Sequence, residues 1–103
     1  MELRDYTDAD AWLTERLETD PDVMAELGGV AKPETLAETH ARRLKTVQGG
    51  DWWFVIEDEG EPVGVIGMWP HEIEGRSEHE VGWMVVPERQ GERIATRALA
   101  IVL

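Results

Sequence analysis

The chain has 103 residues, with 22 Asp or Glu and 10 Lys or Arg, so its formal net charge is −12. This length fits one small domain, and a hydrophobic content of 42% exceeds that of disordered chains. Cysteine is absent, which excludes disulfides and thiolate catalysis. No apolar run approaches the roughly 20 residues that cross a bilayer, and the acidic N-terminus has no signal-peptide pattern. We therefore expect a soluble, cytoplasmic domain that spans no membrane.

Charge is unevenly distributed along the chain. Arg89, Arg93 and Arg97 lie after residue 88 with a single acidic residue, Glu92, whereas the preceding part is strongly acidic. An acidic surface repels nucleic acid and attracts cationic amines, so we expect no nucleic-acid partner. The C-terminal end is where a small anion can bind. The alternative for the charge as a whole is a solvated acidic surface, as in proteins from salt-rich surroundings.

The N-terminal half has the residue spacing of helices. A short strand is expected at residues 3–6, followed by a helix that is capped by Thr7 and buries Leu13 and Leu17. A second helix begins at Asp20-Pro21 and ends at Gly28-Gly29. A third is expected over residues 33–47, where His40 lies on the apolar stripe and is expected to pack rather than to catalyse. That stripe consists of Leu36, His40, Leu44 and Val47.

The C-terminal half changes to the pattern of strands. Antiparallel strands are expected at residues 52–57, 62–69 and 79–86, because these segments are rich in β-branched and aromatic residues. The first two form a hairpin through a turn at residues 58–61, and residues 70–78 are expected to be a polar loop with Gly75 at its tip. A last helix covers residues 94–103, with an apolar face of Ile94, Ala98, Ile101 and Val102. The expected fold class is α+β.

The segment that indicates a binding site runs from Glu80 to Leu99 and has the sequence EVGWMVVPERQGERIATRAL. It predicts a strand, a short turn and the start of a helix, where several backbone N–H groups and the helix dipole favour a phosphate. Neither a Walker Gly-Lys-Ser/Thr nor a G-x-G-x-x-G pattern occurs in the chain. As a bare pattern, a strand-turn-helix also occurs as a purely structural connection, so both interpretations stay open.

The amino-acid sequence of this segment resembles motif A of the GNAT acyl-CoA N-acetyltransferases, whose pattern is Gln/Arg-x-x-Gly-x-Gly/Ala. The matching parts are the strand EVGWMVVPE, the loop at residues 90–95 and the helix start at residues 96–99. Upstream, the Asp20–Met24 segment with Leu27-Gly28-Gly29 resembles the subgroup that acetylates ribosomal-protein N-termini. The resemblance covers essentially the whole chain. It implies that residues 1–103 are a single, partial domain, the N-terminal part of a GNAT fold that in the family continues beyond this helix.

The resemblance implies acetyl-CoA as co-substrate and assigns the residues that bind it. The strand positions whose backbone pairs with the pantetheine arm are Met84, Val85 and Val86, and Val85 or its neighbour supplies the N–H that polarises the thioester carbonyl. The loop and helix start that hold the pyrophosphate consist of Gln90, Gly91, Glu92, Arg93, Ile94, Ala95 and Thr96. Arg93 stands where the family has glycine, so its side chain either obstructs the phosphate or contacts it.

A general base or a water relay is needed because an amine must lose a proton before it attacks. The resemblance implies Glu80 as this catalytic base, and Glu72, Glu74 and His79 are the alternatives. Glu80 is otherwise an ordinary half-exposed strand residue without a catalytic role. His79 and Glu80 alternate on a regular strand, so they cannot both face one site. Tyr6, the sole tyrosine, lies in the wrong place for the tyrosine that protonates the leaving thiolate in many members. The histidines have no metal-ligand spacing, and no metal is expected.

The function that follows from the resemblance is acetyl transfer from acetyl-CoA to a primary amine by direct attack. The acceptor is a protein N-terminus or a small-molecule amine. Because the last expected strand presents an open edge, the alternative is a non-catalytic, shortened module that binds a partner or CoA, or that forms a homodimer through this edge.

Overall fold

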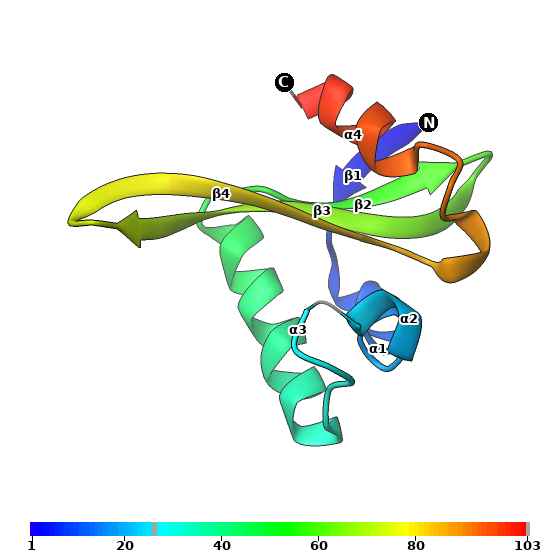
Figure 1. Ribbon diagram of the computed structural model, residues 1–103, viewed down its shortest axis with the longest axis horizontal. Helices are drawn as coiled ribbons and strands as arrows, with labels where there is room; N and C mark the ends of the chain where they lie inside the picture. Colours follow the sequence, from blue (N-terminus) through cyan, green and yellow to red (C-terminus); the bar gives the residue numbers. More distant parts are fainter. Residues whose placement is uncertain (26, 103) are drawn as a thin grey trace.

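The computed structural model describes residues 1–25 and 27–102, without the side chains of residues 69–71 and 73. It contains an antiparallel sheet in the order β1-β2-β3-β4. The strands are β1 (Glu2–Asp5), β2 (Trp53–Asp58), β3 (Glu61–Ile73) and β4 (Arg76–Val85). One face of the sheet is covered by α1 (Ala11–Glu18), α2 (Pro21–Met24) and α3 (Pro33–Gln48), and the other by α4 (Ile94–Val102) (Figure 1). The predicted α+β class and the order of its elements are confirmed.

The first two helices begin where the predicted signals place them. A 3-10 turn, η1 (Asp8–Asp10), comes after Thr7 and leads into α1, where Leu13 and Leu17 are completely buried. Asp20 caps α2 by accepting hydrogen bonds from the backbone N–H groups of Asp22, at 2.9 Å, and Val23, at 3.2 Å. Both helices therefore begin as their caps indicate. The predicted end of the second helix at Gly28-Gly29 is wrong: α2 ends at Met24, because the N–H groups of Leu27 and Gly29 both turn back to the Met24 carbonyl.

The third helix departs from its predicted apolar stripe. Its fully buried residues are Thr39 and Arg43, whereas the predicted stripe, which includes His40, is only partly buried. The reason is that Arg43 is held between α1 and the sheet by Thr14 and Glu18, so polar contacts rather than apolar spacing fix the rotation of α3.

The expected polar loop at residues 70–78 is wrong, since β3 continues to Ile73 and β4 already begins at Arg76. The chain reverses at Glu74 and Gly75, which have φ angles of 50° and 78° and form a tight hairpin turn, so Gly75 is at the tip as expected. This end of the hairpin extends past the helices (Figure 1), and residues 74–80 are exposed. With no helix to cover this end, the sequence there shows no apolar alternation by which strands are recognised.

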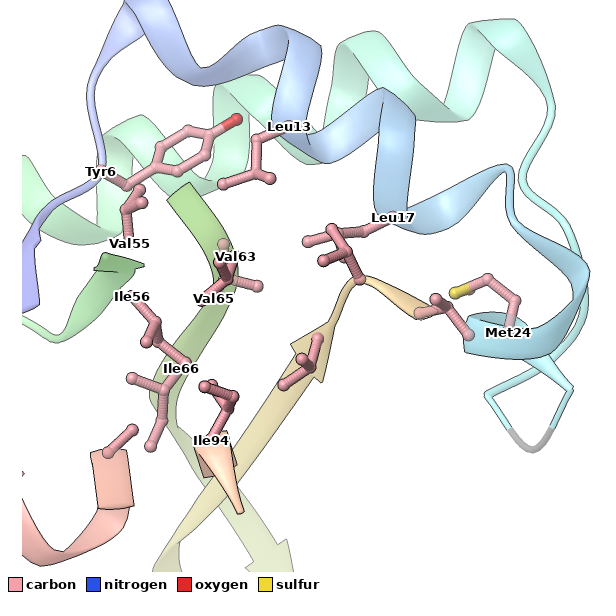
Figure 2. Close-up of a cluster of buried hydrophobic side chains, with 14 residues drawn as sticks. Tyr6, Leu13, Leu17, Met24, Val55, Ile56, Val63, Val65, Ile66 and Ile94 are labelled. Carbon is pink, nitrogen blue, oxygen red and sulfur yellow. The ribbon is translucent and has the colours of Figure 1, made fainter. Parts of the chain in front are cut away.

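The core consists of one layer on each face of the sheet. Figure 2 shows Tyr6, Leu13 and Leu17 on the side of α1, and Ile94 beside Ile66 on the side of α4. On α4, Ile94 and Ala98 are buried as predicted, but Ile101 is 53% exposed, and the expected end of this helix at Leu103 lies outside the described residues. The end of β4 is thereby enclosed between both layers.

Candidate functional site

The end of β4 turns part of its backbone away from the sheet. The N–H of Val86 donates to the carbonyl oxygen of Val63 on β3, at 2.9 Å. Hydrogen bonding alternates along an antiparallel ladder, so the N–H and C=O of Val85 and Trp83 point away from β3. The side-chain Nε2 of Gln90 donates to the Val85 carbonyl at 3.1 Å, in agreement with this outward direction. The N–H of Val85 is therefore directed to the outer edge of β4.

This alternation narrows the predicted set of strand residues. Of Met84, Val85 and Val86, only Val85 directs its backbone groups outward, because those of its neighbours face β3. Trp83, which the sequence analysis did not include, has the same outward direction as Val85 and is 45% exposed. Pairing of all three predicted residues with one extended ligand is thus not possible in this geometry.

The turn after β4 leads directly into the first turn of α4. The N–H of Gln90 is used in a hydrogen bond to the Pro87 carbonyl, at 3.2 Å, within the short turn η2 (Pro87–Arg89). The N–H of Arg97 donates to the Arg93 carbonyl, at 3.0 Å, so α4 starts immediately after Arg93. The amides of Ile94, Ala95 and Thr96 then have no acceptor within the helix, nor elsewhere in the described residues. Of the amides expected at residues 90–95, that of Gln90 is already used, whereas those of residues 91–95, together with that of Thr96, have no acceptor among the described residues.

Arg93 has a φ angle of 60°, in the left-handed region that glycine favours. This is the position at which the motif pattern has glycine. The backbone thus has the conformation for which glycine is suited, although arginine occupies this position in the chain. Arg93 carries conformational strain and places a guanidinium at the start of α4.

A cavity of about 380 Å³, hereafter the β4–α4 pocket, lies where these backbone groups meet. The predicted residues that line it are Met84, Val85, Gln90, Gly91, Arg93, Ile94, Ala95 and Thr96. The predicted residues Val86 and Glu92 do not line it. The sequence analysis missed four further residues that line it: Val23, Leu27, Trp83 and Arg89.

The arginines near this pocket differ in their partners. Arg89 donates to Glu92 and Asp58, and these hydrogen bonds raise the pKa of its guanidinium. Arg97 lies 3.6 Å from the same Asp58 carboxylate. Arg93 lines the pocket and makes no ion pair within the described residues. It is the arginine of this group whose charge is not already balanced by a carboxylate.

The sequence profile of the acetyltransferase (GNAT) domain matches residues 1–103. The chain belongs to the GNAT family. A comparison with curated protein sequences gives no match for this GNAT domain.

Solved GNAT structures have the same fold. A ribosomal-protein-alanine N-acetyltransferase from Brucella melitensis has a TM-score of 0.74 at 24% identity, over 97% of this chain and 63% of its own. A GNAT acetyltransferase from Bacillus anthracis has a TM-score of 0.65 at 22% identity, over 94% of this chain and 56% of its own. One from Staphylococcus aureus has a TM-score of 0.61 at 15% identity, over 98% of this chain and 73% of its own. The GNAT domain thus spans little more than half of the first two relatives.

The candidate bases of the GNAT domain lie along β4 and the hairpin. Glu80 is exposed and shares a face with Gly82 and Met84, the face covered by α1–α3, whereas His79 lies on the opposite face. Glu80 is five residues before Val85, about 16 Å along the strand, which is more than a direct hydrogen bond or a single water spans. Glu72 and Glu74 lie at the far end of the hairpin. Of these carboxylates, Glu80 is therefore nearest to the pocket.

A chain of hydrogen bonds crosses the α1–α3 side of the GNAT domain. Arg43 donates to the Thr14 hydroxyl at 2.6 Å, Thr14 and Tyr6 share a bond of 2.6 Å, and Tyr6 lies 2.5 Å from Nδ1 of His40. Nε2 of His40 is 3.0 Å from the exposed carboxylate of Asp8.

The direction of each bond in this chain follows from its two ends. Arginine only donates and a carboxylate only accepts, so with a neutral imidazole Thr14 donates to Tyr6, and Tyr6 to His40. Burial raises the pKa of Tyr6, which keeps its hydroxyl proton in place. His40 therefore takes part in a structural network, and its role is more than the apolar packing expected from the sequence.

Neither membrane nor metal features are found in the described part of the GNAT domain. None of its helices has the length and apolar character needed to cross a bilayer. Within the same residues, no group of His, Asp and Glu side chains is arranged to hold a metal ion.

Proposed function

We propose that acetyl-CoA binds in the β4–α4 pocket and that its acetyl group is transferred to a primary amine. The diphosphate is held by the amides of residues 94–96 and by Arg93, and the thioester carbonyl lies at the N–H of Val85. The observation that carries this proposal is that all of these residues line one pocket, at the place where the GNAT motif pattern occurs. A helix N-terminus with free amides is a favourable site for a phosphate group.

The reaction requires two contributions from these residues: a hydrogen-bond donor to the thioester carbonyl and an acceptor for the proton of the amine. The amine nitrogen attacks the thioester carbonyl carbon, the C–S bond breaks, and the thiolate leaves with a proton. The N–H of Val85 stabilises the negative charge that develops on the carbonyl oxygen. Glu80, acting through a relay of several water molecules, accepts the proton that the amine must lose. The acceptor is a protein N-terminus or a small-molecule amine, and a cytoplasmic location stays a prediction.

The outer edge of β4 also has an alternative use. A second copy of the chain that paired with this edge would occupy the backbone groups of Val85 and Trp83. Homodimerisation through this edge and binding of acetyl-CoA would therefore exclude each other.

Replacing Thr96 by Glu tests the diphosphate site. Thr96 is exposed in the first turn of α4, where a carboxylate favours the helix but repels an anion. Isothermal titration with acetyl-CoA should show an affinity reduced about tenfold or more. Ala100→Glu adds the same charge to an exposed position of α4 outside the pocket and should bind as the wild type does. Equal affinities for the two variants would contradict the diphosphate site.

Replacing Glu80 by Gln tests the base. We expect turnover to fall about 100-fold, with unchanged affinity for acetyl-CoA, because general-base catalysis contributes on the order of 10² to 10⁴. Glu78→Gln, on the same exposed face of β4, is the matched control and should keep full turnover. Identical rates for wild type and Glu80→Gln at every pH would remove Glu80 from the mechanism.

A further inference from the structure

Two hollows on the α1–α3 face of the sheet meet at Glu18 and Trp53. The larger, about 380 Å³, is also lined by Thr39, Arg42, Arg43 and Thr46. The smaller, about 200 Å³ and hereafter the Glu18 hollow, is also lined by Met24, Leu27, Gly82, Trp83 and Met84. Leu27, Trp83 and Met84 also line the β4–α4 pocket, so the Glu18 hollow adjoins the place proposed for the thioester.

Glu18 has a carboxylate oxygen whose hydrogen bonding is incomplete. The residue is 9% exposed, and its Oε2 is buried with no hydrogen-bond donor among the described residues. Arg43 lies 3.2 Å away and balances the charge, but not in hydrogen-bonding geometry. A buried carboxylate oxygen without a donor is costly, and the group can accept several hydrogen bonds. Glu18 lines the hollow, and its carboxylate, although Oε2 is buried beside Arg43, can still accept an N–H donor from a ligand there.

The other residues that line the Glu18 hollow indicate what kind of chemical group carries the N–H donor of the ligand. The Glu18 hollow is bounded by the side chains of two tryptophans, two methionines and a leucine, with Glu18 as its charged residue. An ammonium on an apolar or aromatic stem matches this surface in charge and in polarity. A net charge of −12 draws such cations toward the protein.

The larger hollow argues against a second positive charge on the same ligand. Arg43, which is buried, and Arg42, which is exposed, both line it. Like charges repel strongly when they are partly desolvated. A polyamine or an aminoglycoside that reached from Glu18 into this space would bring its other amines against two guanidinium groups.

We propose that the Glu18 hollow binds the acceptor, and that the acceptor is a primary amine with one ammonium group on an apolar or aromatic stem. Glu18 accepts a hydrogen bond from the nitrogen, and the two arginines exclude polycations. The assignment of this ligand as the acceptor rests on the proposed acetyl transfer, whereas the binding of the amine itself does not.

The test compares two probes of nearly equal shape, 2-phenylethylamine and 2-phenylethanol, by isothermal titration of the protein without acetyl-CoA. The wild type should bind the amine at least about tenfold more tightly, as expected for a hydrogen bond to a charged group. Glu18→Gln should lose this preference. Glu15→Gln, at an exposed position of the same helix, should keep it. Equal binding of both probes by the wild type, or a preserved preference in Glu18→Gln, would overturn the proposal.

Two further variants test the proposal in other ways: one keeps the ion pair with Arg43 so that the protein still folds, and the other tests the exclusion of polycations. Glu18→Asp keeps a charge for Arg43 but retracts the carboxylate, so its preference for the amine should fall, and an unchanged preference would refute the role of Glu18. Arg42→Ala should improve the binding of spermidine relative to 2-phenylethylamine, and no improvement would refute exclusion by the arginines. Titration of the same proteins with acetyl-CoA keeps the two proposals apart, because an absence of binding there would contradict only the acetyl transfer.

Discussion

The β4–α4 pocket and the Glu18 hollow are built from different parts of the polypeptide. The pocket is formed mainly by residues of one continuous segment, 83–96, and its geometry depends on a strand end, a turn and a helix start. The hollow and the polar chain behind it are formed by side chains that come from α1, α3 and the sheet. Amides that bind an anion are thus supplied by local conformation, whereas the buried carboxylate depends on long-range packing.

This difference predicts how the two regions respond to substitution. Side-chain changes in the pocket should alter affinity more than stability. Side-chain changes around the hollow should destabilise the domain, because a buried polar group that loses its partner pays the full cost of desolvation.

Gly67→Ala should have the largest effect. Trp53 packs directly over Gly67, and a Cβ there would lie 1.9 Å from Cε3 of the indole. The indole would have to leave its place beneath Arg43, whose guanidinium carbon lies 4.5 Å from the ring centroid. We expect chemical denaturation to show a loss of about 3 kcal/mol in the free energy of unfolding, the upper end of the usual cost of overpacking. Gly49→Ala meets only ordinary contacts, and a loss as large there would contradict this explanation.

Thr14→Val should have the next largest effect. Valine has nearly the same shape but lacks the hydroxyl that accepts from Arg43 and bonds to Tyr6. We expect a loss of about 2 kcal/mol in the free energy of unfolding, since two buried groups lose a partner. Affinity for acetyl-CoA should not change. Thr35→Val, at an exposed position of α3, is the control, and a similar loss there would show that the polar chain contributes nothing special.

Arg93→Gly should have the smallest effect on stability and a visible one on binding. Glycine adopts the observed φ angle of 60° without strain, so we expect the free energy of unfolding to rise by about 1 kcal/mol. Affinity for acetyl-CoA should fall about tenfold, because the guanidinium that lines the pocket is lost. Arg93→Ala should lose the same affinity without the gain in stability.

If Arg93→Gly instead bound acetyl-CoA more tightly, Arg93 would have the opposite role. The side chain would then obstruct the approach of the phosphate to the backbone, the alternative that the sequence left open.

The sequence predicted the pocket better than the hollow for a physical reason. The order strand, turn and helix start, and the position of Arg93, could be inferred because caps, turns and apolar spacing are local signals. The direction of the Val85 backbone could not, since it depends on which residue of β3 pairs with it. Glu18 and Arg43 gave no signal either, because charged residues on helices are usually exposed and their burial here is settled by packing between α1, α3 and Trp53. The far half of the hairpin was missed because its described side chains, at residues 72 and 74–80, are exposed and show no apolar alternation.

Because the β3–β4 hairpin extends past the helices, the hydrogen bonds between these two strands differ along their length in how well they are shielded from water. Near Val65 and Met84 the rungs lie between two layers of core, whereas near Glu72 and Ser77 the described side chains are exposed to water. Amide protons at the first place should exchange with solvent only when the whole domain opens, and those at the second through local fraying. The same two strands therefore span the range from the slowest to the fastest exchange that the sheet offers.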